Sequence, residues 1–409
     1  MKNERGYPKA SITKKGEASL RAGHSWVYEA EIVSLSEEPE NGGLVDILNE
    51  KGRYLGTGLF SLHSKIRIRL ISRNANDKFD EAFWLRRLSY AWQYRKTVMH
   101  SDISCCRVIF GEADQFPGLT VDLFQDVLVT QTLSIGMERL KPLLFPLLFD
   151  LLRKDGIVLR GIYERNDVAI RDLEGLQQGK GWFPLAGAQK DFGPTQTIII
   201  ENGIRYLVDF ENGQKTGYFL DQKYNRLAVA KLAKGKRVLD CFTHTGSFAL
   251  NAALGGAEHV TAVDVSSSAI EMAQTNAKDN GLDAKIDFLT ENVFDLLPRL
   301  EASHAKYDLI VLDPPAFTKS RKTMLSAMGG YREINGRAMR ILPRGGYLAT
   351  CSCSHFASDE MFQTMLRHAA GDAGVTLRQI EMRQQAPDHP ILWGMPETNY
   401  LKFYLFQVV

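Results

Sequence analysis

Short apolar runs and helix-length amphipathic segments alternate through the C-terminal half of the chain. The runs predicted to be strands cover residues 237–240, 260–264, 285–289, 309–312, 346–350, 376–381 and 401–408. This alternation predicts a largely parallel sheet covered by helices on both faces. No helix-length segment separates the last two runs, so we expect them to pair antiparallel. Residues 201–409 are therefore predicted to form an α/β domain with a seven-stranded sheet and a terminal antiparallel hairpin.

The N-terminal half has a different pattern. Residues 1–75 contain β-rich runs between glycine and polar turns, which predicts a small β-barrel. Residues 76–200 combine helical segments at 83–98 and 136–152 with strand-like runs on either side of a Pro-Gly turn, which predicts an α+β domain. The fold class is thus multidomain α/β, with domains predicted at 1–75, 76–200 and 201–409.

Arginines stand out in both N-terminal regions. Arg67 and Arg69 alternate with isoleucines, so both should project from one face of a sheet, either as a solvated face or as a surface that contacts phosphates. The arginines at 86, 87 and 95 of the first long helix are predicted to be exposed to solvent.

Composition excludes several classes of protein. A 409-residue chain with 44% hydrophobic and 24% charged residues is typical of a globular protein of two or three domains. Five irregularly spaced cysteines argue against a disulfide framework and favour a reducing compartment. The N-terminus lacks an apolar signal core and no apolar stretch is long enough for a membrane span, so we expect a cytoplasmic protein. A net charge of +2 says little about partners, and we expect no metal site.

Two carboxylates end the first two predicted strands of the α/β domain. Asp240 precedes a turn, residues 241–247, in which Gly246 allows backbone to approach a ligand at a helix N-terminus. Asp264 ends the next strand, where a carboxylate can accept both ribose hydroxyls of a nucleoside. The turn lacks the G-x-G-x-x-G spacing that pyrophosphate requires. This pattern favours S-adenosylmethionine as cofactor, although each aspartate could also be a simple strand-end cap.

A carboxyl group and a thiol follow two later strands. Asp313-Pro314-Pro315-Ala316-Phe317 ends one apolar run, and Cys351-Ser352-Cys353-Ser354 ends the next. Both ends should face one crevice of an open α/β sheet, where such folds bind ligands. This pair suggests covalent chemistry on a planar, electron-poor substrate. Alternation along an extended segment does not distinguish Cys351 from Cys353, because both point to the same side.

These motifs occur together with three others, in the same order as in the bacterial PUA-domain ribosomal-RNA methyltransferases. The chain therefore resembles this family, the large-subunit cytosine-5 group. The additional segments are Arg21 to Tyr28, similar to the family's PUA entry segment; Gly111 to Asp122, similar to the hairpin of its central domain; and Asn212 to Gln222 with Asn225-Arg226, similar to its K-T-G-[FY]-[FY]-L-D-Q signature. The resemblance covers nearly the whole chain.

The resemblance implies an N-terminal PUA domain that binds RNA, a central α+β domain and a class I, Rossmann-like methyltransferase domain. It also implies a set of cofactor-binding residues: Lys215, Thr216, Gly217, Tyr218, Phe219, Asp221, Gln222, Arg226, Asp240, Thr245, Gly246, Asp264, Asn292 and Asp313. Asn292 departs from the family, which often has an acid near the adenine. Its amide carbonyl can still accept a hydrogen bond from the exocyclic amine.

Cytosine chemistry explains the need for a thiol and an acid. Carbon 5 is a poor nucleophile until a thiolate adds to carbon 6, and a carboxylic acid at ring nitrogen 3 stabilises the charge that develops. By resemblance, Cys353 is the nucleophile and Asp313 the acid. The base that removes the proton from carbon 5 is not identified.

Residues in and after the Asp-Pro-Pro corner are predicted to bind the substrate: Pro314, Pro315, Phe317, Lys319 and Arg321, with Lys322 beside them. Phe317 is either a stacking face for an extruded base or a core aromatic. The basic residues are either phosphate contacts or a solvated loop.

The resemblance implies large-subunit ribosomal RNA as the partner. A homodimer is also compatible with the sequence, although no motif specifies one. One alternative is methylation of a nucleobase nitrogen, which uses a related D-P-P-[FY] corner without a cysteine nucleophile. A second is a noncatalytic ribosome-assembly factor that retains cofactor affinity. A nicotinamide dehydrogenase shares the sheet architecture but requires the glycine triplet that is absent here.

Overall fold

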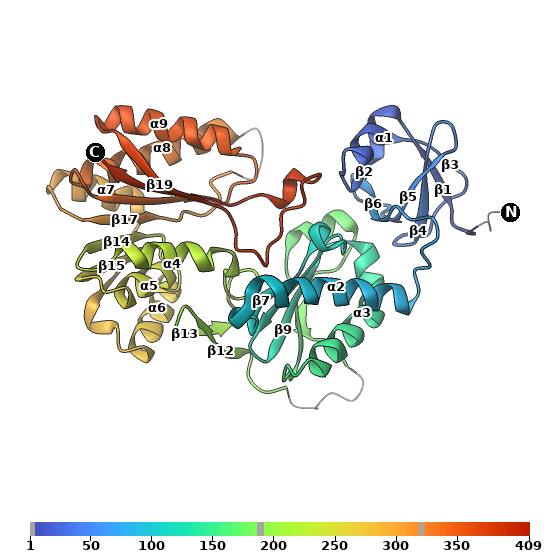
Figure 1. The fold of residues 1–409 in the computed structure, drawn as a ribbon, viewed down its shortest axis with the longest axis horizontal. Helices are drawn as coiled ribbons and strands as arrows, with labels where there is room; N and C mark the ends of the chain where they lie inside the picture. Colours follow the sequence, from blue (N-terminus) through green and yellow to red (C-terminus); the bar gives the residue numbers. More distant parts are fainter. Residues whose placement is uncertain (1–4, 186–191, 319–322) are drawn as a thin grey trace. The chain divides into compact units, whose positions relative to one another are not determined.

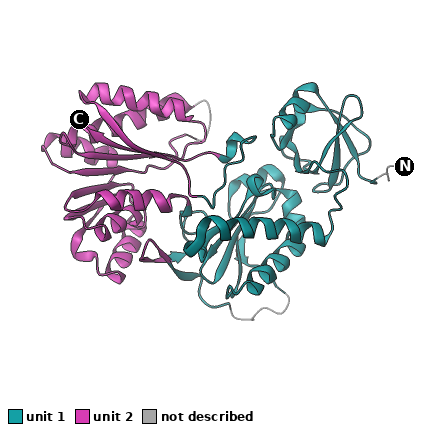
Figure 2. Cartoon of the chain, viewed as in Figure 1, with its two compact units in different colours: residues 1–199, 208–220, 387–398 teal, residues 200–207, 221–386, 399–409 magenta. Residues whose placement is uncertain are grey.

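A computed structural model describes residues 5–185, 192–318 and 323–409 of the chain. Contacts divide it into two compact units, shown in Figure 2. Unit 1 comprises residues 1–199, 208–220 and 387–398, and unit 2 comprises residues 200–207, 221–386 and 399–409. The chain therefore passes between the units several times, and two short segments of the predicted C-terminal domain pack within unit 1.

Unit 1 begins with a six-stranded sheet of order β2-β6-β5-β4-β1-β3. Its elements are β1 (Lys9–Ile12), α1 (Lys14–Arg21), β2 (Trp26–Tyr28), β3 (Ile32–Leu35), β4 (Leu44–Asn49), β5 (Tyr54–Phe60) and β6 (Ile66–Ser72). Alternate positions of these strands point inward, so Val45, Ile47 and Ile68 join one buried apolar cluster. The small β domain predicted from the sequence thus has a core of its own.

The rest of unit 1 holds a five-stranded sheet of order β11-β10-β9-β8-β7 and two long helices. Its elements are α2 (Glu81–Met99), β7 (Cys105–Phe110), β8 (Leu119–Phe124), β9 (Val127–Thr132), α3 (Ile135–Lys154), β10 (Gly161–Arg165) and β11 (Lys180–Trp182). Asp80 caps α2 by accepting from the Phe83 amide, and Ser134 caps α3 by accepting from the Met137 amide. Strands β12 (Gln196–Glu201) and β13 (Ile204–Asp209) form a two-stranded sheet.

The arginine predictions in this unit were partly wrong. Arg95 is fully buried, because its guanidinium donates to both carboxylate oxygens of Asp114, at 2.5 and 2.7 Å. Arg69 is also buried and pairs with Glu174 at 2.7 Å, so it belongs neither to a solvated face nor to a phosphate-contacting surface. A sequence pattern cannot indicate these partners because both come from elsewhere in the chain.

Unit 2 is built on a seven-stranded sheet of order β16-β15-β14-β17-β18-β20-β19. The strands are β14 (Arg237–Cys241), β15 (His259–Asp264), β16 (Ile286–Thr290), β17 (Leu309–Leu312), β18 (Tyr347–Ser352), β19 (Leu377–Arg383) and β20 (Lys402–Val408). Strand β20 runs antiparallel to both β18 and β19, and the other neighbours pair parallel. The predicted strand count, the terminal hairpin and the fold class are confirmed.

Helices cover both faces of this sheet (Figure 1). They are α4 (Lys223–Leu232), α5 (Ser247–Leu254), α6 (Ser267–Asp279), α7 (Val293–Ala302), α8 (Met324–Ile341) and α9 (Asp359–Ala373). Helices α7, α8 and α9 share one apolar core with the sheet, and α4, α5 and α6 lie on its other face. In this architecture the carboxyl ends of β14, β15, β17 and β18 lie along one edge of the sheet, which positions the side chains that follow them.

No helix in the described ranges has both the length and the apolar character needed to cross a bilayer.

Candidate active site

The end of β14 and the turn after it hold two buried polar atoms without a hydrogen-bond partner in the part of the chain that the structure describes. Asp240 Oδ2 accepts hydrogen bonds from Thr243 Oγ1 at 2.5 Å and from the Ala249 amide at 2.9 Å. Among the described residues, Asp240 Oδ1 and Thr245 Oγ1 have no hydrogen-bond partner although both atoms are buried. Buried polar groups are nearly always paired in native proteins. A ligand with complementary polar groups would satisfy both atoms.

Burial, together with the carboxylates of Asp313 and Asp264, raises the pKa of Asp240 to about 7, against the hydrogen bonds that it accepts. Desolvation disfavours the charged carboxylate, and a cationic ligand would offset this.

Gly246 closes this turn in a left-handed conformation, with φ of +83°. A Cβ atom there would lie 2.6 Å from Leu250 Cδ1 and 3.0 Å from Ala273 Cβ. Gly246 is therefore needed both for the backbone conformation and for the close packing of α5 against α6.

Asp264 joins the turns that follow β14 and β15. Its Oδ2 accepts from the His244 amide at 2.9 Å and its Oδ1 accepts from the Ser266 amide at 3.0 Å. Each oxygen keeps a second lone pair, so the carboxylate can still accept hydroxyl groups. Asn292, by contrast, is exposed and uses its side-chain oxygen to cap α7 through the Phe294 amide at 3.0 Å.

Asp313 follows β17 and is surrounded by polar side chains of unit 2. Gln222 Nε2 donates to Asp313 Oδ1 at 3.0 Å, and the Cys351 thiol is a further hydrogen-bonding neighbour. Burial and the charge of Asp221 raise the pKa of Asp313 to about 6, against the opposing effects of Arg226 and of the hydrogen bond from Gln222. With this pKa roughly a tenth of the carboxyl group is protonated at pH 7, far more than at the ordinary value of 3.8, so Asp313 is better suited to donate a proton than an ordinary aspartate.

The two cysteines after β18 differ in accessibility. Cys351 is completely buried, and burial together with Asp313 raises the pKa of its thiol well above the ordinary value. Cys353 lies one residue beyond the strand end and is only half-buried, with its Sγ 3.9 Å from the Pro314 carbonyl oxygen. The structure thus brings Cys353, and not Cys351, to the surface beside the Asp-Pro-Pro corner.

Sequence reasoning missed the residues that hold the cysteine loop. Lys402 pairs with Ser352 across β20 and β18, and its Nζ donates to the carbonyl oxygens of Ser354 and Ala357, both at 2.8 Å. Tyr331 of α8 contacts the hydroxyls of Ser354, at 3.0 Å, and Ser352, at 3.1 Å. One signal in the sequence could have indicated Lys402: it is a lysine within the apolar run 401–408. A buried strand tolerates a lysine only when polar groups surround its charge.

The corner residues differ in exposure. Pro314 is buried and Pro315 is exposed. Phe317 is half-buried in an aromatic cluster, with ring-centroid distances of 4.6 Å to Tyr331 and 5.7 Å to Phe294. These contacts favour the interpretation of Phe317 as a core aromatic. Lys319, Arg321 and Lys322 lie outside the described residues.

The remaining predicted cofactor residues fall into two groups. In unit 2, Asp221 accepts from the Tyr400 hydroxyl at 2.5 Å, and Arg226 forms a buried ion pair with Glu201 at 2.7 Å. In unit 1, Thr216 donates to Asp122 at 2.6 Å, Tyr218 is buried, and the Lys215 ammonium lies 5.0 Å from the centroid of Phe219. Gly217 has φ of +123°, and a Cβ there would lie 2.9 Å from Val208 Cγ1. Contacts within unit 1 thus account for the sequence of this segment.

Comparison with known proteins decides the family. Residues 191–405, more than half of the chain, match a family described as S-adenosylmethionine-dependent methyltransferase. The chain belongs to this methyltransferase family. Its cofactor is S-adenosylmethionine, and residues 11–73 match a PUA-like domain.

Relatives of this methyltransferase match nearly all of its length. It is 37% identical over 405 residues to "Ribosomal RNA large subunit methyltransferase I" of Klebsiella pneumoniae subsp. pneumoniae, covering 98% of this chain and 99% of the relative. It is also 37% identical over 400 residues to the protein of the same name from Escherichia coli O127:H6, covering 97% and 98%.

Solved structures show the same fold. A protein from Streptococcus mutans described as a SAM-dependent methyltransferase has a TM-score of 0.80 at 23% identity, and a second structure, complexed with SAH, has a TM-score of 0.82 at 24% identity. Each comparison covers 98% of this chain and 100% of the other.

The turn after β14 fits the methyltransferase cofactor chemically. S-adenosylmethionine carries an ammonium group, a carboxylate and ribose hydroxyls, and the unpartnered Asp240 Oδ1 and Thr245 Oγ1 can accept from or donate to such groups.

Proposed function

We propose that the chain methylates carbon 5 of a cytosine in large-subunit ribosomal RNA through a covalent adduct with Cys353. The observation that carries the proposal is the accessible Cys353 thiol beside the Asp-Pro-Pro corner, together with an Asp313 carboxyl whose pKa is about 6. The names of the relatives support ribosomal RNA as substrate. The site of action would then be the cytoplasm.

The proposed roles divide the reaction between two side chains. The Cys353 sulfur adds to carbon 6 of the cytosine, and the electron pair of the ring double bond moves toward nitrogen 3, where the Asp313 carboxyl donates a hydrogen bond or a proton. The cofactor supplies an electrophilic methyl group. Once carbon 5 carries this methyl group, its proton is lost to a base, and the Cys353 thiolate leaves as the ring double bond reforms.

Several contacts support these roles. Lys402 and Tyr331 fix the loop that carries Cys353, which reduces the entropy lost when the sulfur reaches the ring. Gln222 orients Asp313 by donating to one carboxylate oxygen, and the other oxygen can carry the proton.

We further propose that Asp240, Thr245, Gly246 and Asp264 hold the methionine and ribose parts of the cofactor, with Asp221, Gln222 and Arg226 near its entrance. The unpartnered oxygens of the β14 turn and the carboxylate at the end of β15 support this assignment. Contributions from 215–219 and Asn292, and substrate contacts from Pro314, Pro315 and Phe317, remain predictions. The proposed domains are 1–75, 76–200 and 201–409, of which the PUA-like match at 11–73 supports the first.

The test combines a methylation assay with a trapping assay. Transfer of tritiated methyl groups to ribosomal RNA should be abolished by Cys353→Ala and retained by the matched variant Cys351→Ala, with cofactor binding intact in both. RNA containing 5-fluorocytidine should form a stable adduct with the wild type and none with Cys353→Ala, because fluorine at carbon 5 cannot leave as a proton. Full methyl transfer by Cys353→Ala, or a methyl group mapped to a ring nitrogen by mass spectrometry, would refute the proposal.

A further inference from the structure

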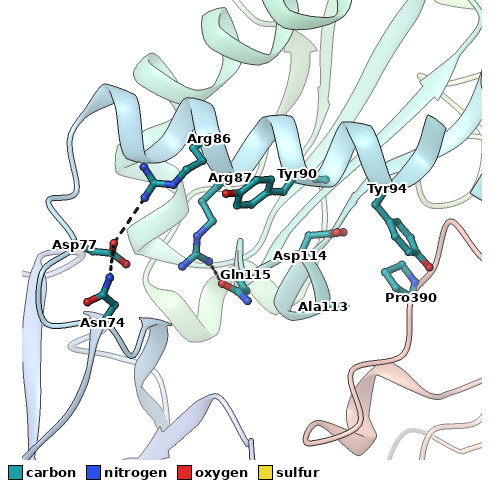
Figure 3. Close-up of a pocket in the computed structure, with 11 residues that line it drawn as sticks. Asn74, Asp77, Arg86, Arg87, Tyr90, Tyr94, Ala113, Asp114, Gln115 and Pro390 are labelled. Carbon is teal, nitrogen blue, oxygen red and sulfur yellow. Dashed lines mark hydrogen bonds and ion pairs between the residues drawn. The ribbon is translucent and has the colours of Figure 1, made fainter. Parts of the chain in front are cut away.

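A groove in unit 1 lies outside the residues assigned to methyl transfer. It has a volume of about 690 Å³ and is bordered by α2, by the short helix η3 (Gly111–Asp114) and by the segment after β6. The lining residues are Asn74, Asp77, Arg86, Arg87, Tyr90, Ala91, Tyr94, Ala113, Asp114, Gln115 and Pro390 (Figure 3). Its volume is typical of pockets that bind small molecules or parts of larger ligands.

Helical spacing places two tyrosines and an arginine in one row along this groove. Arg86, Tyr90 and Tyr94 are four residues apart, so they lie on the same face of α2 over about 12 Å at 1.5 Å per residue. Tyr90 is 64% exposed and Tyr94 is 38% exposed. The opposite face of α2 already supplies the core through buried residues such as Leu88 and Trp92. The core therefore gives no reason for large rings at 90 and 94.

The charges that face the groove are partly compensated. Arg86 pairs with Asp77 at 3.7 Å, while Arg87 donates to the Ile71 carbonyl oxygen at 2.7 Å and to the neutral side chain of Gln115. Asp114 is neutralised by the buried Arg95. Arg86 is thus balanced by Asp77, whereas Arg87 has only neutral partners among these contacts, so the groove carries one net positive charge, which favours an anionic ligand.

The walls of the groove are held in place by buried contacts. Besides Asp114, Arg95 donates to the carbonyl oxygens of Arg107, at 2.7 Å, and Asp388, at 2.9 Å. The Tyr94 hydroxyl donates to the Pro387 carbonyl oxygen at 2.9 Å, which fixes the orientation of its ring. A ligand would therefore bind without the entropy cost of ordering these elements.

We propose that this groove binds an unpaired stretch of RNA, with bases stacked on Tyr90 and Tyr94 and a backbone phosphate at Arg86. Exposed aromatic rings beside a cationic side chain are the combination that binds single-stranded nucleic acid, since every base offers a face for stacking. The choice of RNA as the nucleic acid rests on the proposed function. The groove itself rests on the geometry of α2.

The test measures binding of a short labelled single-stranded RNA by fluorescence anisotropy. The double variant Tyr90→Ala/Tyr94→Ala should bind about 5- to 150-fold more weakly for each stacked base lost. Tyr90→Phe keeps the ring and should bind as the wild type does. Arg86→Ala should reduce the slope of log affinity against log salt concentration by about 1. Arg153→Ala, which removes an exposed arginine at the end of α3, is the matched charge control and should leave this slope unchanged.

Three outcomes would overturn the proposal. They are an unchanged RNA affinity in the double variant, a loss of RNA affinity in Tyr90→Phe as large as that in the double variant, and binding of cytidine monophosphate as tight as that of RNA. Methylation provides a separate readout, in which the double variant should raise KM for ribosomal RNA while kcat is retained. If the wild type binds RNA through the tyrosines but methylates no ribosomal RNA, the proposed function fails and the groove stands. If the wild type methylates ribosomal RNA and the double variant binds it normally, the groove fails alone.

Discussion

The buried carboxyl group of Asp240, at the end of β14, should make the stability of unit 2 depend on pH. The carboxyl group is 1% exposed, and burial raises its pKa from an ordinary value of 3.8 to about 7. Between these values the unfolded chain releases the proton and the native state keeps it, so the free energy of unfolding falls as pH rises. At 1.36 kcal/mol per pKa unit, the difference between 3.8 and about 7 amounts to about 4 kcal/mol.

The substitution Asp240→Asn should remove this dependence, because an amide cannot ionise and its oxygen can still accept from Thr243 and the Ala249 amide. Relative to the wild type, the variant should gain stability in unit 2 as pH rises from 5 to 7, by about 2 kcal/mol, because the slope of 1.36 kcal/mol per pH unit halves as pH reaches the native pKa of about 7. Below pH 3.8 both states are protonated and this gain should vanish.

Hydrogen exchange of amides in β14, followed by mass spectrometry of the protein without added cofactor, measures the stability of unit 2 at each pH. All five tryptophans of the chain lie in unit 1, so fluorescence during urea unfolding provides an internal control. Parallel pH curves for the wild type and the variant would refute the reasoning, as would an equal change in the fluorescence of unit 1.

Two further predictions concern buried cations. Arg95→Met leaves the Asp114 carboxylate buried without its partner, so urea unfolding followed by tryptophan fluorescence should show a loss of about 3–5 kcal/mol in unit 1. The exposed Arg153→Ala should change this value by less than about 0.5 kcal/mol, and an equally small effect at Arg95 would contradict the prediction. Burial lowers the pKa of Lys402 to about 8, so below that pH its positive charge should favour the thiolate of Cys353. Lys402→Met should therefore move the alkylation of Cys353 by iodoacetamide to higher pH, which peptide mass spectrometry measures. The matched control Lys278→Met, at an exposed position, should leave the pH profile of alkylation unchanged. Identical profiles for Lys402→Met and the wild type would count against the electrostatic role.

The sequence was sufficient for the architecture of unit 2 and for the positions of Asp240, Asp264 and Asp313. Strand-helix alternation depends on local periodicity, and the parallel strands that it predicts must carry the residues at their ends to one edge of the sheet. The missing glycine triplet counted against a pyrophosphate ligand for an equally local reason, because a tight turn needs those glycines to let pyrophosphate approach the backbone.

Tertiary structure decided what periodicity cannot encode. Cys351 and Cys353 are equivalent in an alternating pattern, and the sequence distinguished them only through the family resemblance. The burial of Cys351 and the contact of Cys353 with Pro314 give the physical difference between them. From its sequence context Arg95 was expected on the surface. In the structure it is buried, and its guanidinium lies 2.5 Å from the Asp114 carboxylate. Lys402 became a support for the cysteine loop through a strand pairing between residues 50 positions apart. A side chain's pKa, exposure and partners depend on neighbours that folding brings from distant parts of the chain, whereas helix and strand patterns depend only on residues that are close in sequence.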